Sequence, residues 1–297
     1  MELVLETKEL TKIYSKRSVV DKVSMKVSKG DIYGFIGRNG AGKTTTMRLV
    51  LGMIFPNSGE VEIFGKPACD ESRAKIGSLI EAPGLYKKCT AYENLRRFSL
   101  LFGGDDKKIK QILELVQLQD TGKKKAGAFS LGMRQRLGIG IALLGDPDFL
   151  VLDEPVNGLD PAGIKDVRDT ILNINKEKNV TILISSHLLG ELAKISTRYG
   201  IINNGALIEE FSADELYDKC RKTLNIVTDD TDKAAKIISD KYSITPEKKD
   251  NSKISLYDGF DKAPEMLSDL VMGGCRIHDF HIESADMEDY FIERIGK

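Results

Sequence analysis

Short apolar runs alternate with longer stretches of helical periodicity through the first two-thirds of the chain, a pattern typical of an α/β domain. Two of the runs, FLVL and VTILI, are apolar on both faces, which predicts strands buried inside a parallel sheet. The strands expected from the runs of this region span Leu3–Glu6, Ile32–Ile36, Val61–Phe64, Phe149–Leu152 and Val180–Ser185.

Helical periodicity predicts the other elements of this region. One helix is expected directly after Gly42, and others over Ala91–Phe102, Lys107–Val116 and Leu131–Leu144. A further helix is expected to begin near Pro161, because Asp160 before it is a suitable N-cap. Because the stretch between Tyr92 and Phe129 is mostly helical, we expect an inserted helical subdomain at about residues 90–145.

The pattern changes after about Leu216 and predicts a second, smaller α/β domain. Its expected elements, in chain order, are strand Leu224–Val227, helix Lys233–Lys241, strand Lys253–Leu256, helix Ala263–Met272, strand Arg276–Ile282 and helix Asp286–Ile295. We therefore expect domains at residues 1–216 and 217–297.

Composition excludes several classes of protein. Of the 297 residues, 41% are hydrophobic and 30% are charged, which allows an ordinary core and excludes wholesale disorder. The formal net charge of −1 argues against a generic nucleic-acid binder. The four cysteines are far apart and form no CxxC pair, so we expect neither a disulfide framework nor a zinc site.

The sequence also bears on location. No apolar run approaches the ~18 residues that a membrane-spanning helix needs. The first ten residues, MELVLETKEL, lack the basic and apolar segments of a signal peptide. We therefore expect a protein of the reducing cytosol, which other subunits must hold at a membrane if it works there.

The segment Gly37–Thr44 fits the phosphate-binding pattern GxxxxGK[ST] between an apolar strand and a helix. Glycines let successive N–H groups point at phosphate oxygens, and the helix N-terminus adds positive potential. Lys43 is expected to neutralise the β- and γ-phosphates, and the Thr44 hydroxyl to bind Mg²⁺. The candidate nucleotide-binding residues here are Gly37, Arg38, Asn39, Gly40, Ala41, Gly42, Lys43, Thr44 and Thr45.

Two carboxylates follow the buried run FLVL, at the carboxyl end of a strand, where open α/β sheets bind ligands. Asp153 is expected to hold Mg²⁺ through its water shell. Glu154 is the natural general base for a water that attacks the γ-phosphate. The sequence therefore predicts that the chain binds a nucleoside triphosphate and hydrolyses it.

Further motifs, in order, resemble those of the ATP-binding cassette (ABC) family over about residues 3–215. FSLGMRQR (Phe129–Arg136) resembles the family signature LSGGQ followed by QR, and GLDP (Gly158–Pro161) resembles the loop after the catalytic glutamate. His187 in SSH corresponds to the family's switch histidine, which the resemblance implies holds the γ-phosphate and the attacking water. Tyr14 in TKIY occupies the position of the aromatic residue that stacks on adenine.

The resemblance implies a head-to-tail dimer with ATP bound between the P-loop of one chain and the signature helix of the other. Leu131 replaces a signature glycine and Met133 replaces the glutamine. Ser130 and the backbone N–H groups of Leu131 and Gly132 still provide an anion site at a helix N-terminus. Hydrolysis would remove the γ-phosphate contacts and open the dimer.

Glu81 stands where the family usually carries a glutamine, after the strand that follows the P-loop helix. A carboxylate is a stronger ligand for a hard metal ion than an amide and adds negative charge near the γ-phosphate. We therefore assign Glu81 a catalytic and metal-binding role. This glutamate, together with SLGMRQRLG, resembles the ATPases of bacterial lantibiotic-immunity and bacitracin-type resistance transporters.

The leading hypothesis is an ATPase subunit that energises a bacterial exporter of antimicrobial peptides. Separate membrane permease subunits would handle the peptide and hold the chain at the inner face of the membrane, and no nucleic acid is involved. One alternative is an ABC ATPase that acts on ribosomes or DNA; the single cassette and the lack of heptads and of a basic excess disfavour it. A regulatory module without turnover is the other alternative, and Glu154 and His187 argue against it.

Overall fold

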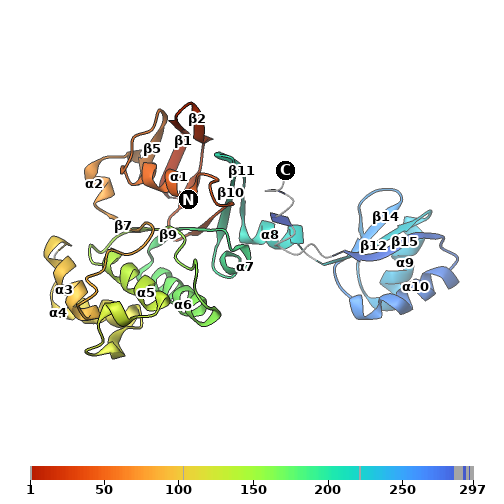
Figure 1. Cartoon of the computed structure of the whole chain (residues 1–297). Helices are drawn as coiled ribbons and strands as arrows, with labels where there is room; N and C mark the ends of the chain where they lie inside the picture. The colour runs from red at the N-terminus through yellow and green to blue at the C-terminus, as the bar shows by residue number, and fades with distance from the viewer. Residues whose placement is uncertain (1, 103, 221, 284–289, 292–293, 295–297) are drawn as a thin grey trace. The chain divides into compact units, whose positions relative to one another are not determined.

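The computed structural model describes residues 2–102, 104–220, 222–283, 290–291 and 294. The chain divides into two compact units, one formed by Met1–Ala213 with Phe291–Lys297 and the other by Asp214–Tyr290 (Figure 1). Within the described ranges, no helix is long and apolar enough to span a membrane.

A six-stranded sheet with the order β11-β10-β4-β9-β8-β7 forms the centre of the first unit. Its strands are β4 (Ile32–Ile36), β7 (Ile76–Leu79), β8 (Phe149–Leu152), β9 (Thr181–Ser186), β10 (Arg198–Asn203) and β11 (Ala206–Ser212). All neighbours are parallel except β10 and β11. Every residue of β4, β8 and β9 is buried, which confirms the interpretation of the apolar runs as central strands.

A second, antiparallel sheet of the first unit has the order β2-β1-β5-β6, with β3 also paired to β1. Its strands are β1 (Leu3–Tyr14), β2 (Arg17–Val23), β3 (Lys26–Ser28), β5 (Ser58–Ile63) and β6 (Lys66–Pro67). The hydrophobic pattern predicted only the start of β1 and the end of β5. Register shifts in β1 around Leu10 and Lys12 break the alternation of buried and exposed residues, so the pattern did not extend further.

Helices complete the first unit. They are α1 (Lys43–Val50), α2 (Asp70–Arg73), α3 (Ala91–Phe102), α4 (Asp106–Leu115), α5 (Leu131–Ala142), α6 (Pro161–Lys178), α7 (Leu189–Leu192) and the first residue of α8 (Ala213–Cys220). Helices α3, α4 and α5 contact one another, within the range where a helical subdomain is expected. Asp160 caps α6 by accepting a hydrogen bond from the N–H of Gly163 at 3.2 Å, as its position before Pro161 predicted.

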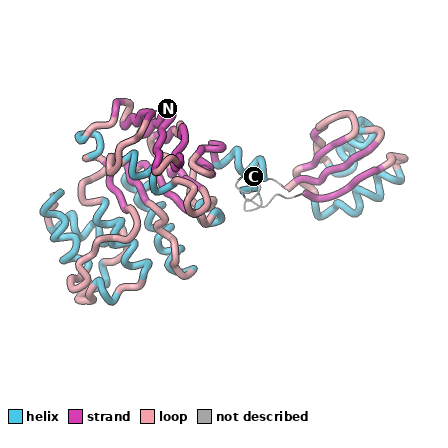
Figure 2. The backbone as a smooth tube through the Cα atoms, turned by 45° about the horizontal axis from the view of Figure 1, so that its top comes forward, coloured by secondary structure: helices cyan, strands magenta, loops and turns pink. Residues whose placement is uncertain are grey.

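The second unit has the element order βαββαβ and an antiparallel sheet with the order β13-β14-β12-β15. Its elements are β12 (Thr223–Thr228), α9 (Thr231–Tyr242), β13 (Glu247–Lys248), β14 (Lys253–Leu256), α10 (Ala263–Met272) and β15 (Ile277–Glu283). Both helices pack on one face of the sheet, against Leu224, Ile226, Ile254 and Leu256 (Figure 2). The two-residue β13 was too short to show a sequence pattern.

The end of the chain differs from the expected domain boundary. The ring of Phe291 is fully buried, with its centroid 6.4 Å from that of Tyr199 and 6.1 Å from that of Phe211, both in the first unit. Phe291 follows the second unit in the sequence, but it belongs to the first unit because its large aromatic ring is buried there. The helix expected over Asp286–Ile295 falls mostly on residues 286–289, 292–293 and 295, which lie outside the described residues.

Candidate active site

The phosphate-binding segment lies between β4 and α1, enclosed on both sides by backbone. A Cβ atom on Gly37 would lie 2.4 Å from the carbonyl oxygen of Ile202, and one on Gly42 would lie 2.6 Å from that of Val19. Gly42 also has a φ of 110°, which strains any residue with a side chain. The close approach of the loop therefore requires glycine at both positions.

The Lys43 side chain folds back over this loop. Its ammonium group donates hydrogen bonds to the carbonyl oxygens of Gly37 at 2.6 Å and Arg38 at 3.2 Å. The side chain is 5% exposed and lies 3.1 Å from Glu154 Oε1. A buried cation is thus held by backbone oxygens and one carboxylate, at the start of a helix whose N-terminus favours anions.

Thr44 and Asp153 meet across the sheet. The Thr44 hydroxyl donates to Asp153 Oδ2 at 2.8 Å, and the buried carboxylate accepts a second hydrogen bond, at 2.6 Å, from the Ser185 hydroxyl. Ser185 Oγ also accepts from the N–H of Glu154 at 2.9 Å. Ser185 was not among the expected site residues, although it belongs to the SSH segment at the end of β9.

These oxygens suit a hard cation. Mg²⁺ prefers oxygen ligands and is usually held by one or two protein groups together with substrate phosphates and water. Thr44 and Asp153 provide a hydroxyl and a carboxylate at one place. Within the part of the chain that the structure describes, no cluster of three His, Cys, Asp or Glu residues could hold a metal ion alone. The donor set therefore fits a metal ion that enters with a nucleotide.

Glu154 connects the phosphate-binding loop to the end of β9. Its Oε1 lies 3.1 Å from Lys43 Nζ, and its Oε2 lies 2.7 Å from His187 Nδ1. The residue has a φ of 48°, in the left-handed region that non-glycine residues seldom adopt. Strained backbone at such a position is typical of functional sites. The structure thus brings together three of the expected residues, Lys43, Glu154 and His187.

Glu81 lies just beyond β7 but does not bond to the candidate metal ligands. Its side chain is 67% exposed and forms an ion pair with Arg48 at 2.5 Å, rather than with Thr44 or Asp153. The adjoining backbone is fixed, because the N–H of Asp153 donates to the carbonyl oxygen of Leu79 at 2.8 Å. Arg48 was not among the expected site residues, and no local pattern in the sequence links it to Glu81.

The loop after Glu81 packs on the signature helix. A Cβ atom on Gly138 of α5 would lie 2.7 Å from Pro83 Cβ and 3.0 Å from Leu79 Cδ1. We therefore expect Gly138→Ala to lower the free energy of unfolding by about 1–3 kcal/mol, as overpacked cores do. Urea unfolding measures this loss. Gly84→Ala is the matched control, because a Cβ atom there meets nothing within 4 Å, and equal stability of both variants would contradict the tight contact.

The signature residues lie at the start of α5, outside the cluster around Lys43. The Ser130 hydroxyl caps α5 by accepting from the N–H of Met133 at 3.2 Å, and neither it nor Gly132 bonds to the phosphate-binding loop. A Cβ atom on Gly132 would lie 3.3 Å from Gly163 Cα, so α5 and α6 approach closely here. The anion site expected at this N-terminus therefore has no hydrogen bond to the chain's own phosphate-binding loop among the described residues.

Arg136 links α5 to the end of α4 and to α6 through hydrogen bonds and an ion pair. Its guanidinium donates to the carbonyl oxygens of Val116 at 3.2 Å and Gln117 at 3.0 Å, at the end of α4, and lies 3.2 Å from Asp166 Oδ2 of α6. The sequence placed Arg136 in the signature but gave it no role. These contacts hold the signature helix between the helical subdomain and α6.

Tyr14, the candidate adenine partner, is the last residue of β1 and is 46% exposed. The ammonium group of Lys12 lies 5.1 Å from its centroid, within the range of a cation–π contact. An accessible aromatic face is what stacking on a base requires.

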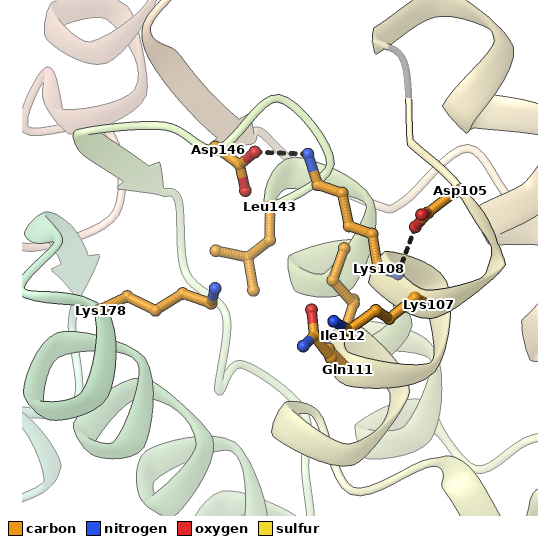
Figure 3. A pocket seen from close by; sticks show the side chains of 8 residues that line it. All are labelled: Asp105, Lys107, Lys108, Gln111, Ile112, Leu143, Asp146 and Lys178. Atoms are coloured by element: carbon orange, nitrogen blue, oxygen red, sulfur yellow. Dashed lines mark hydrogen bonds and ion pairs between the residues drawn. The ribbon is translucent and has the colours of Figure 1, made fainter.

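A cavity of about 240 Å³ lies apart from these residues, between α4 and the segment before β8 (Figure 3). The ion pair of Lys108 and Asp146, with Nζ and Oδ2 2.6 Å apart, spans its rim. None of its lining residues is among the expected site residues. It is a crevice at the base of the helical subdomain.

Comparison with known proteins identifies the family of this chain and several similar proteins. The family described as ABC transporter matches residues 20–157. The bacitracin transport ATP-binding protein BcrA of Bacillus licheniformis is 42% identical over 100% of this chain and 98% of its own length. The lantibiotic transport ATP-binding protein SrtF of Streptococcus pyogenes is 41% identical over 207 residues, which are 70% of this chain and 90% of SrtF.

A solved structure shares the fold of the larger unit. The ADP conformation of MJ1267, an ATP-binding cassette of an ABC transporter, matches with a TM-score of 0.67 and 25% identity. The match covers 74% of this chain and 95% of that one.

Proposed function

Because this chain belongs to the ATP-binding proteins of ABC transporters, and so binds and hydrolyses ATP, we propose that it energises the removal of antimicrobial peptides of the bacitracin or lantibiotic type. The observation that carries this proposal is its similarity to a bacitracin transport ATP-binding protein over nearly the whole of both chains. Glu81, in place of the usual glutamine, supports the same assignment.

The roles of the site residues are part of the proposal. Lys43 and the N–H groups of the loop from Gly37 to Thr45 would hold the triphosphate, with Tyr14 against the adenine. Glu154 acts as the general base for the attacking water, and His187, 2.7 Å from its carboxylate, orients that base and the γ-phosphate. The contacts of Glu154 with Lys43 and His187 support this arrangement.

Mg²⁺ would be held by Thr44 and Asp153, with Glu81 as a further ligand. When bound, Mg²⁺ neutralises charge on the phosphate oxygens. The Ser185 hydroxyl orients the Asp153 carboxylate by donating to Oδ1, which leaves Oδ2 facing Thr44.

We further propose that two copies close head to tail on two ATP molecules. Ser130 and Gly132 of each chain would contact the γ-phosphate on the other chain, since neither bonds to its own P-loop. Each closed site then places the triphosphate between Lys43 of one chain and a helix N-terminus of the other.

Membrane permease subunits are the proposed partners. They would carry the peptide across the membrane and hold this cytoplasmic chain at its inner face, without any part for nucleic acid. The alternative, an ABC ATPase that acts on ribosomes or DNA, has no specific observation in its favour.

Resistance of cells tests the proposed transport. In a sensitive bacterial host, the chain expressed with its membrane permease subunits is expected to raise the inhibitory concentration of bacitracin or a lantibiotic. The same membrane proteins with Asp153→Asn, which loses the expected metal-binding charge, should give no protection. The proposal is contradicted if the native chain and Asp153→Asn protect the cells equally, or if the native chain hydrolyses ATP but gives no protection.

A further inference from the structure

We propose that Arg48 is a positioning residue for Glu81, holding its carboxylate beside the P-loop helix and offsetting its charge. This inference rests on the proposed catalytic role of Glu81. It concerns ATP turnover by the chain itself and does not depend on which peptide is transported.

Arg48 and Thr44 share one face of α1. They are four residues apart, so their side chains are neighbours on the helix surface. Most other positions of α1 are buried, namely Lys43, Thr46, Met47, Leu49 and Val50. The guanidinium Nη2 lies 2.5 Å from Glu81 Oε1, which places this carboxylate on the side of α1 that carries the Thr44 hydroxyl.

The chain on both sides of Glu81 is held by the fold, whereas its side chain is exposed and pairs with Arg48. Leu79 accepts a hydrogen bond from Asp153 at 2.8 Å, and Pro83 packs on Gly138, so the loop is fixed on both sides of Glu81. Glu81 itself has a φ of 62°, in the left-handed region. Its exposed carboxylate has Arg48 as its ion-pair partner and would otherwise rotate freely in water.

The expected effect of this ion pair is electrostatic and concerns the charge near the triphosphate. An exposed ion pair adds little to stability, with a median close to zero. A free carboxylate near a bound triphosphate, however, repels it, whereas a glutamine at the same place would not. The guanidinium offsets that charge and fixes the carboxylate in one direction. Arg48 should therefore matter for turnover only while residue 81 is a glutamate.

A double-mutant cycle on the full-length chain tests this dependence. The variants are Arg48→Gln, Glu81→Gln, the two combined, and Arg48→Lys, each measured for kcat and KM for ATP with Mg²⁺. We expect Arg48→Gln to lower kcat about three- to tenfold in the native chain and to have no further effect beside Glu81→Gln, as coupled neighbours behave. Arg48→Lys keeps the charge and should restore most of kcat.

Thermal unfolding and a matched ion pair separate positioning from folding. Arg48→Gln should leave the unfolding midpoint unchanged. Lys108→Gln removes a comparable exposed pair, Lys108 with Asp146, far from the P-loop along the chain, and should leave kcat unchanged.

The proposal is overturned if Arg48→Gln lowers kcat equally in both backgrounds, if it has no effect in the native chain, or if Arg48→Lys fails to restore kcat. If the variants show the expected kinetics but the native chain gives cells no peptide resistance, only the proposed transport function is contradicted.

Discussion

Glu154→Gln is expected to bind ATP almost normally and to lose turnover by about 10²-fold or more, the range for loss of a general base. Glutamine has the same shape and retains a carbonyl oxygen that can accept from Lys43. It lacks the negative charge that takes a proton from water. Because ATP then persists, the variant should also form a dimer with ATP but not with ADP.

Steady-state phosphate release and light scattering measure these two effects. Glu93→Gln is the matched control: Glu93 also pairs with a lysine, Lys125 at 3.1 Å, but lies in the helical subdomain. Near-normal hydrolysis by Glu154→Gln would show that another group is the base. A stable dimer without nucleotide would contradict the proposed assembly on ATP.

Lys43→Ala should weaken ATP binding by about 10- to 100-fold, since a hydrogen bond to a charged group contributes roughly 1.5–3 kcal/mol. The ammonium is buried and set against the loop carbonyls of Gly37 and Arg38, within the loop that is proposed to hold the triphosphate. The phosphate charge would remain in the site without the ammonium group that pairs with it. Isothermal titration calorimetry with ATP measures the loss.

Lys29→Ala provides the comparison for this variant, because it removes a surface lysine that pairs with Glu2 at 3.0 Å. It should bind ATP normally. Unchanged affinity in Lys43→Ala would remove Lys43 from the nucleotide site, and circular dichroism of both variants verifies that the fold is intact.

The expected elements that the structure confirms share one property: their signal lies within a few consecutive residues. The runs Ile32–Ile36 and Phe149–Leu152 are strands at the expected residues because fully buried strands need apolar side chains on both faces. The helix over Ala91–Phe102 also begins and ends as expected. Where bulges interrupt the alternation, as in β1, the pattern failed and β2 and β3 went unpredicted.

Contacts between residues far apart in the chain depend on the fold and not on a local pattern. Thr44 and Asp153 are 109 residues apart, and Glu154 and His187 are 33 apart. The sequence identified each of these residues, since the motifs are local. Ser185 lies in the SSH segment but was given no role, and Arg48 belongs to no local pattern. The bond of Ser185 to Asp153 and the ion pair of Arg48 with Glu81 became visible only in the assembled structure.

The sequence by itself therefore determined the chemistry of this protein: a phosphate-binding loop, two carboxylates after a buried strand and the motifs of an ABC ATPase. Only the tertiary structure decided which side chains meet, because the order β11-β10-β4-β9-β8-β7 brings β4 beside β9 and β8 beside β7. Parallel strands align their carboxyl ends at one edge of the sheet, and this order is set by long-range packing that local hydrophobic periodicity does not encode.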